Sequence, residues 1–320
     1  MEFTRRDFLK LVGAGVAASG LAYLVFWPEK RQGKYDTAEG IADYFRGKGI
    51  DPTVRVNGDR TLVCIGEIHS ESGDEYVKFF DKAGQDVKID AIFGEGELAG
   101  RRSWQDIGEY VEEDFHLVGF ANGIQDPAEI EERKRRVAED PQGYFRLSRK
   151  FNIFGVEDRD PYVDTLVLLN IQETSMRLKL KPSDKEVRDA LDKIKRLAAK
   201  LKTIEFEVPE TEDQDVWKFF HDNIYKRAND STDRIALHQR NSIFADNIDR
   251  ELAPEQVGAF IVGQHHVGLG RTTEFGPDGV SLVDVKLEDT MLPLLDQKGI
   301  SYVVISLDDV IKFNKRGYFW

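Results

Sequence analysis

Runs of apolar, β-branched and aromatic residues recur along this chain, separated by helix-forming segments, and this alternation constrains the fold most strongly. Residues 61–66 read TLVCIG without polar alternation, which is typical of a strand buried on both faces. Parallel sheets covered by helices contain such strands. The runs at which we expect strands are 61–66, 89–94, 152–157, 257–263, 279–286 and 300–306. We therefore predict an α/β fold, with a central, mostly parallel sheet flanked by helices and a helical insertion.

The segments between these runs have the pattern of helices. Ser183, followed by Glu186 three residues later, is typical of a capping box at a helix start. Helices are expected at 37–47, 75–84 and 287–298 and almost throughout 161–251. The predicted organisation is an amino-terminal segment at 1–30, a linker and leading helix at 31–60, and one α/β domain at 61–320, with a helical insertion at about 98–150 and the long helical segment at 161–251.

Composition excludes several classes of protein. Of the 320 residues, 41% are hydrophobic and 32% are charged, which fits a globular body rather than a disordered or multispanning chain. The formal net charge of −13 argues against nucleic acid or an acidic membrane surface as the main partner, because both would repel the protein. A single cysteine, Cys64, excludes an internal disulfide framework, and its place within TLVCIG predicts a small buried core residue.

The amino-terminal segment has the pattern of an export signal. Arg5 and Arg6 precede Phe8, Leu9 and Lys10, and the uncharged run 11–27 follows, which resembles a twin-arginine (Tat) signal. This run of 17 residues is about the minimum for a membrane-spanning helix. Cleavage after the small residues near 20–22 is one interpretation. An uncleaved anchor is the other, and we favour it because aromatic residues continue the run. Both place the body on the extracytoplasmic side of the membrane.

Two expected strands end in the same motif. Gly66 is followed three residues later by His69, and Gly263 is followed three residues later by His266. In open α/β sheets, ligands bind outside the carboxyl ends of the strands, and glycine there allows a sharp turn and close approach to a ligand. A single histidine after a strand is usually a structural turn residue, whereas two such motifs favour a functional site. His265 precedes His266, and the motif spacing selects His266 as the inward residue.

Acidic residues follow the same strands. Glu67 lies in the first motif, Glu95 and Glu97 follow the run 89–94, and Glu157 and Asp158 follow residues 152–156. Each alone is an ordinary solvated strand end. Together with the histidines they suit either a divalent metal that activates water or a histidine held by a carboxylate as general base. The spacing does not decide between these two chemistries.

The segment ALHQRNSIFADNI supplies a further candidate group. On a helix, His238, Asn241 and Ala245 fall on one stripe, with Arg240 on its flank. One interpretation is an ordinary polar helix face. The functional interpretation has Arg240 and Asn241 reaching the strand ends, where they bind an anionic substrate group or orient a carboxylate.

Taken together, the two Gly-x-x-His motifs, the strand-end glutamate, DRDPYVDTL and RNSIFADNI resemble the TraB/Tiki family. This family belongs to a superfamily that includes the erythromycin esterase-like and ChaN haem-binding proteins. The resemblance covers roughly 61–306, in islands. It implies an α/β sheet with a helical insertion, and it implies that His69, His266 and Glu95 are active-site residues. Activities known in the superfamily include metal-dependent peptidase, esterase and haem binding.

The resemblance and the residues lead to one expectation with alternatives. We expect an exported, membrane-anchored hydrolase that cleaves an amide or ester in a small-molecule or peptide substrate, assisted by Mn, Zn, Fe or Co. The expected catalytic residues are His69, Glu67, Glu95, His266 and Arg240, and the expected metal ligands are His69, Glu95, His266 and Glu157. The alternatives are a haem- or metal-binding protein without turnover and a peptide-binding regulator.

Overall fold

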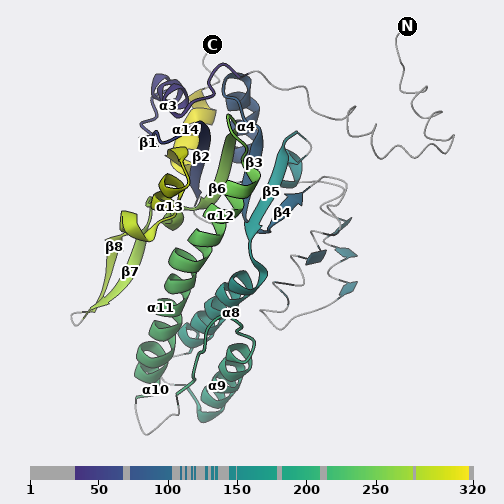
Figure 1. Cartoon of the computed structure of the whole chain (residues 1–320). Helices are drawn as coiled ribbons and strands as arrows, with labels where there is room; N and C mark the ends of the chain where they lie inside the picture. The colour runs from purple at the N-terminus through teal and green to yellow at the C-terminus, as the bar shows by residue number, and fades with distance from the viewer. Residues whose placement is uncertain are drawn as a thin grey trace, which may run out of the picture. The chain divides into compact units, whose positions relative to one another are not determined.

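A computed structural model of the chain describes a mixed sheet covered by helices on both faces (Figure 1). It describes residues 33–67, 73–102, short pieces between 109 and 135, 144–148, 150–178, 182–209, 215–276 and 279–316. The export-type signal at 1–30 and His69 lie outside the described residues. None of the helices in the described part of the chain is both long and apolar enough to span a bilayer.

Seven strands of the described chain form the main sheet, in the order β1-β9-β2-β6-β3-β5-β4. The five inner strands pair in parallel, whereas β1 and β4 pair antiparallel at the two edges. The strands are β1 (Thr53–Arg55), β2 (Arg60–Glu67), β3 (Ala91–Leu98), β4 (Gly100–Arg102), β5 (Asn152–Glu157), β6 (Val257–Gly263) and β9 (Ile300–Ser306). This arrangement confirms the predicted α/β fold with a mostly parallel sheet.

Each inner strand contributes to two hydrophobic cores because successive side chains point to opposite faces of a sheet. Val63 and Ile65 pack in one core with α3 (Ala38–Gly47), α4 (Gly73–Asp86) and α14 (Leu307–Arg316). The alternate residues Leu62 and Cys64 pack in the other core with α12 (Asn241–Glu251) and α13 (Leu292–Gln297). Cys64 is fully buried, as predicted, and burial raises the pKa of its thiol.

The long helical segment predicted at 161–251 has a third core of its own. Its helices before α12 are called the helical insertion from here on, whereas most of the insertion predicted at 98–150 lies outside the described residues. Val167 and Ile171 of α8 (Arg159–Met176) pack in it with Ile194 of α9 (Asp184–Ala198) and with Phe220 and Ile224. The capping box predicted at the start of α9 is present, since Ser183 Oγ accepts from Glu186 N at 3.3 Å and Ser183 N donates to Glu186 Oε2 at 2.7 Å.

A continuous helical run joins this insertion to the sheet, and Figure 1 shows α11 continuing into α12. Its α-helical parts are interrupted twice by wider π-helical turns. The run consists of α10 (Val216–Lys218), η2 (Phe219–Tyr225), α11 (Lys226–Arg234), η3 (Ile235–Arg240) and α12. Ile235 packs in the insertion core, whereas Phe244 and Ile248 pack against the sheet. The second π-helical turn therefore lies where the run passes from one core to the other.

The strand predicted at 279–286 is present as β8 (Gly279–Asp284), but it pairs with β7 (Arg271–Gly276) in a separate antiparallel ribbon and not with the main sheet. One local prediction is wrong. The helix expected at 287–298 is divided into a 3₁₀ turn, η5 (Leu287–Asp289), and the shorter α13. Thr290 separates them, and its hydroxyl donates to Leu287 O and accepts from Leu292 N.

Candidate functional site

The strands that carry the two Gly-x-x-His motifs are direct neighbours. β2 and β6 pair in parallel with Gly66 opposite Val262 and Glu67 opposite Gly263. Both motifs therefore leave the sheet on the same side, at the carboxyl ends of the strands, which is called the carboxyl edge below. β3 and β5 lie beyond β6 and end at the same edge. Gly66 allows close packing here, because a Cβ atom would lie 2.8 Å from Leu269 Cδ1. The carboxyl ends of β2, β6, β3 and β5 therefore form the edge expected to hold a site.

His266 lies in the 3₁₀ turn η4 (Gln264–Val267), directly after β6, and is 4% exposed. Its Nδ1 lies 2.6 Å from Asn241 Oδ1, and its Nε2 lies 3.4 Å from Glu95 Oε1. The imidazole also packs against the Phe244 ring, with centroids 5.2 Å apart. By contrast, His265 lies against the backbone of Gly270, where an added Cβ would overlap its ring. His266 is thus the member of the pair that faces the other strand-end groups.

Arg240 joins two of these strand ends. Its Nη2 donates to Glu95 Oε1 at 2.7 Å, and its Nε donates to Glu157 Oε2 at 3.1 Å. A second bond from Nη2 to Glu157 Oε1 makes the contact with Glu157 bidentate. Arg240 is only 5% exposed, and its guanidinium lies over the Phe244 ring at 5.2 Å. Two roles were expected for Arg240, binding an anionic substrate group or orienting a carboxylate. Its contacts in the structure match the second role.

Backbone amides also donate hydrogen bonds to the two carboxylates. Gly263 N donates to Glu95 Oε2 at 2.5 Å, and Gly96 N donates to Glu157 Oε1 at 3.1 Å. Gly96 has a φ of +87°, a conformation that glycine adopts without steric cost. The register between β3 and β5 shifts in this region, between Gly94 and Leu98. This irregular end of β3 therefore presents both Glu95 and the Gly96 amide to the site.

Two acidic side chains of the cluster, Glu95 and Glu157, share the guanidinium of Arg240. Burial raises the pKa of Glu157 despite the attraction of Arg240, and the nearby Glu95 charge raises it further. Burial opposes the charge of Arg240 too, but the two carboxylates outweigh it and raise the pKa of the guanidinium.

The junction between the π-helical turn η3 and α12 supplies two consecutive residues to this cluster. Arg240 ends η3 and contacts the carboxylates, while Asn241 begins α12 and contacts His266. The Asn241 side chain also donates to Leu237 O at 2.6 Å and to Asp289 O at 2.8 Å. His238, on the predicted stripe, is exposed. Sequence periodicity suggested that Asn241 reaches the strand ends but did not reveal His266 as its partner.

The other predicted residues lie apart from this cluster or outside the described chain. Glu67 accepts a hydrogen bond from the Tyr76 hydroxyl at 2.7 Å, and Tyr76 belongs to the core on the α4 side of the sheet. Glu67 is thus at the same edge as His266 but directed to the opposite face. Asp158 precedes α8 as an exposed N-cap residue without a side-chain capping bond. His69 falls within 68–72, outside the described residues.

Arg240 competes with a metal ion for two of the predicted metal ligands, Glu95 and Glu157, and a third, His69, lies outside the described residues. Both oxygens of Glu157 are bonded to Arg240, and the guanidinium that also binds Glu95 would repel a cation placed between the carboxylates. In the part of the chain that the structure covers, no three His, Cys, Asp or Glu side chains are grouped to share a metal ion.

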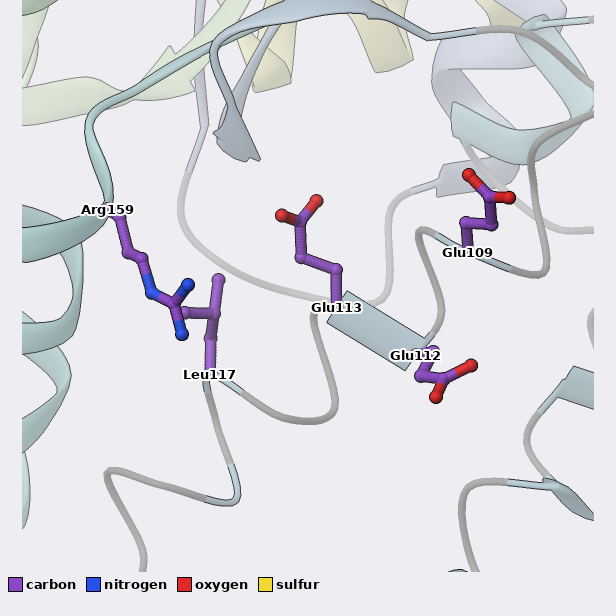
Figure 2. Close-up of a pocket in the computed structure, with 5 residues that line it drawn as sticks. All are labelled: Glu109, Glu112, Glu113, Leu117 and Arg159. Carbon is purple, nitrogen blue, oxygen red and sulfur yellow. The ribbon is translucent and has the colours of Figure 1, made fainter.

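A cavity of about 380 Å³ lies apart from the strand-end cluster of His266, Glu95, Glu157, Arg240 and Asn241. Figure 2 shows the side chains of Glu113 and Arg159 directed into the same space. Its lining residues are Glu109, Glu112, Glu113, Leu117 and Arg159. Arg159 is the first residue of α8, two positions after Glu157. The cavity is therefore lined mainly by acidic side chains of the 98–150 segment.

Comparisons with known proteins give no further assignment. No family model matches the chain, and no curated protein and no solved structure is significantly similar to it.

Proposed function

We propose that this chain is an extracytoplasmic hydrolase of the TraB/Tiki type that cleaves an ester or amide. The observation that carries the proposal is the position of His266, whose Nε2 lies 3.4 Å from Glu95 Oε1 at the carboxyl edge of four parallel strands. A histidine beside a buried carboxylate suits general acid–base catalysis, because the carboxylate stabilises the imidazolium formed when the histidine accepts a proton.

In the proposed reaction, His266 Nε2 accepts a proton from a water molecule, and the resulting hydroxide attacks the carbonyl carbon of the substrate. The tetrahedral intermediate then collapses with cleavage of the C–O or C–N bond. The imidazolium returns its proton to the leaving alcohol or amine. The burial of Glu95, whose side chain is 5% exposed, strengthens its interaction with the imidazolium.

Arg240 has a supporting role in this proposal. Its bonds to Glu95 and Glu157 hold the Glu95 carboxylate in place beside His266. We assign it this role in place of the other one expected from the sequence, the binding of an anionic substrate group. His69 comes two residues after β2 in the sequence and lies outside the described residues.

The test compares two adjacent histidines. A panel of p-nitrophenyl esters and unstructured peptides first identifies a substrate that the wild type cleaves. On that substrate, we expect His266→Ala to lower kcat by about 10²–10⁴-fold, since general-base catalysis contributes about this much. His265→Ala is the matched control, because His265 lies against Gly270 outside the cluster, and it should retain activity. Activity is measured on the full-length chain, with thermal unfolding of each variant in parallel.

Two results would contradict the proposal. Full activity in His266→Ala would remove the proposed base from the reaction. Near-stoichiometric manganese, zinc, iron or cobalt in wild type purified without chelator, and lost in His266→Ala, would replace it with metal-assisted hydrolysis or metal carriage. We expect metal content well below one ion per chain because the Arg240 guanidinium disfavours a cation at Glu95.

A further inference from the structure

The two ends of the Asn241 amide can be distinguished by their neighbours. One end lies 2.6 Å from Leu237 O and 2.8 Å from Asp289 O, and both of these are carbonyl acceptors. Only the NH₂ group can donate to two carbonyls, so this end is Nδ2. The opposite end, facing His266 Nδ1 at 2.6 Å, is therefore the oxygen Oδ1.

The identity of this oxygen determines where the His266 proton lies. Oδ1 can only accept a hydrogen bond, so His266 Nδ1 must donate and therefore carries hydrogen. A neutral imidazole has one N–H, which leaves a lone pair on Nε2. This nitrogen is the one that lies 3.4 Å from Glu95 Oε1.

We propose that Asn241 is a positioning residue that holds neutral His266 in the tautomer with hydrogen on Nδ1 and a free lone pair on Nε2. The inference rests on the proposed function only for the use made of that lone pair, which is to accept the proton of water. Asn241 is suited to this role because it is fully buried and its amide is held in one orientation by two backbone carbonyls. The second of these, Asp289 O, belongs to η5 and lies 48 positions further along the chain.

Glu95 favours the opposite tautomer, and distance decides between the two. A carboxylate beside Nε2 attracts hydrogen to that nitrogen, but the separation of 3.4 Å exceeds normal hydrogen-bonding distance. Glu95 Oε1 already accepts from Arg240 at 2.7 Å. The contact between Nδ1 and Asn241 Oδ1 is shorter, at 2.6 Å, and the Asn241 side chain that makes it is fully buried. The Asn241 contact therefore dominates.

The direct test is a nitrogen NMR measurement on the full-length chain labelled with ¹⁵N-histidine at pH 8. The His266 signals are identified by their loss in His266→Gln. We expect a protonated Nδ1 and an unprotonated Nε2. A proton on Nε2, in the other tautomer or in the imidazolium, would overturn the inference. This readout needs no substrate, so a positive result together with an inactive wild type would reject the proposed function alone.

A matched pair of variants separates positioning from structural support. Asn241→Asp and Asn241→Leu both lose the donors to Leu237 O and Asp289 O, but only Asn241→Leu loses the acceptor for His266 Nδ1. We expect both to lower thermal stability. Only Asn241→Leu should move hydrogen to Nε2, and its kcat should fall by about 10²-fold or more with KM little changed. Retention of hydrogen on Nδ1 in Asn241→Leu would contradict the assignment.

Discussion

At the scale of single residues, the candidate site is defined by a group of buried charges that share one guanidinium. Arg240 binds both Glu95 and Glu157, and all three side chains are at most 6% exposed. Removal of one partner from a buried ion pair is strongly destabilising because an unpaired charge remains in a medium of low dielectric. The cluster therefore both orients Glu95 and makes the folded state sensitive to protonation.

We expect Glu157 to give the folding free energy a measurable pH dependence. Because the pKa of Glu157 is raised in the folded state, the folded protein binds more protons than the unfolded chain above the ordinary pKa of about 4.5. The stability contributed by protonated Glu157 is fully present below that pH and is lost as pH rises through the folded pKa. Urea unfolding of wild type and Glu157→Gln from pH 4 to 8 should show this decline only in the wild type.

An exposed glutamate serves as the control for this experiment. Glu173 pairs with Arg177 four residues later on α8, and its side chain is 52% exposed. Glu173→Gln should change stability little, since exposed pairs of this kind contribute less than about 1 kcal/mol. Equal pH profiles for wild type and Glu157→Gln would show that Glu157 titrates normally in the folded protein.

At the scale of elements, the helical insertion is held by a buried carboxylate as well as by its apolar core. Asp164 of α8 is fully buried and accepts from Lys202 N, Thr203 N and Thr203 Oγ1 at 2.6–3.1 Å. These donors belong to the segment that follows α9. Asp164 thereby connects the chain after α9 to α8, the helix that follows Glu157 at the end of β5.

Loss of this carboxylate should weaken the insertion. We expect Asp164→Ala to lower the free energy of unfolding by about 2–4 kcal/mol, because several buried donors lose a charged acceptor. Asp192→Ala, at an exposed position of α9, should cost less than about 0.5 kcal/mol. Urea denaturation measures both, and equal stabilities of the two variants would contradict the anchoring role of Asp164.

At the scale of the whole molecule, the proposed location depends on the amino-terminal segment, which precedes the described residues. Substitution of Arg5 and Arg6 by lysine together should retain the chain in the cytoplasm, because the twin-arginine pattern is the feature that resembles an export signal. Cell fractionation and protease accessibility of the body measure the outcome. Lys30→Arg, which lies outside the pattern, is the control, and normal export of the double variant would reject the assignment.

Local sequence patterns were enough to predict the class of fold and the strand ends where the candidate site lies. TLVCIG predicted a doubly buried strand because local hydrophobic patterning reports burial, and Ser183 predicted a helix start because a capping box involves only neighbouring residues. The short edge strands β1 and β4 escaped prediction because three residues carry too little periodicity. The strand β8 was predicted, but its partner β7 was not, because local patterning does not specify which strands pair.

How the candidate residues meet could not be predicted from local patterns, because it depends on the order of the strands in the sheet. The tertiary structure placed β6 between β2 and β3, and it joined Arg240 to Glu157 and Glu95, which lie 83 and 145 positions away in the chain. It also directed Glu67 to Tyr76 and gave His266 its partner Asn241. Buried charges and hydrogen-bonding groups pair with whichever groups the fold brings within about 3 Å. Which groups these are depends on strand order, and strand order is not a local property of the sequence.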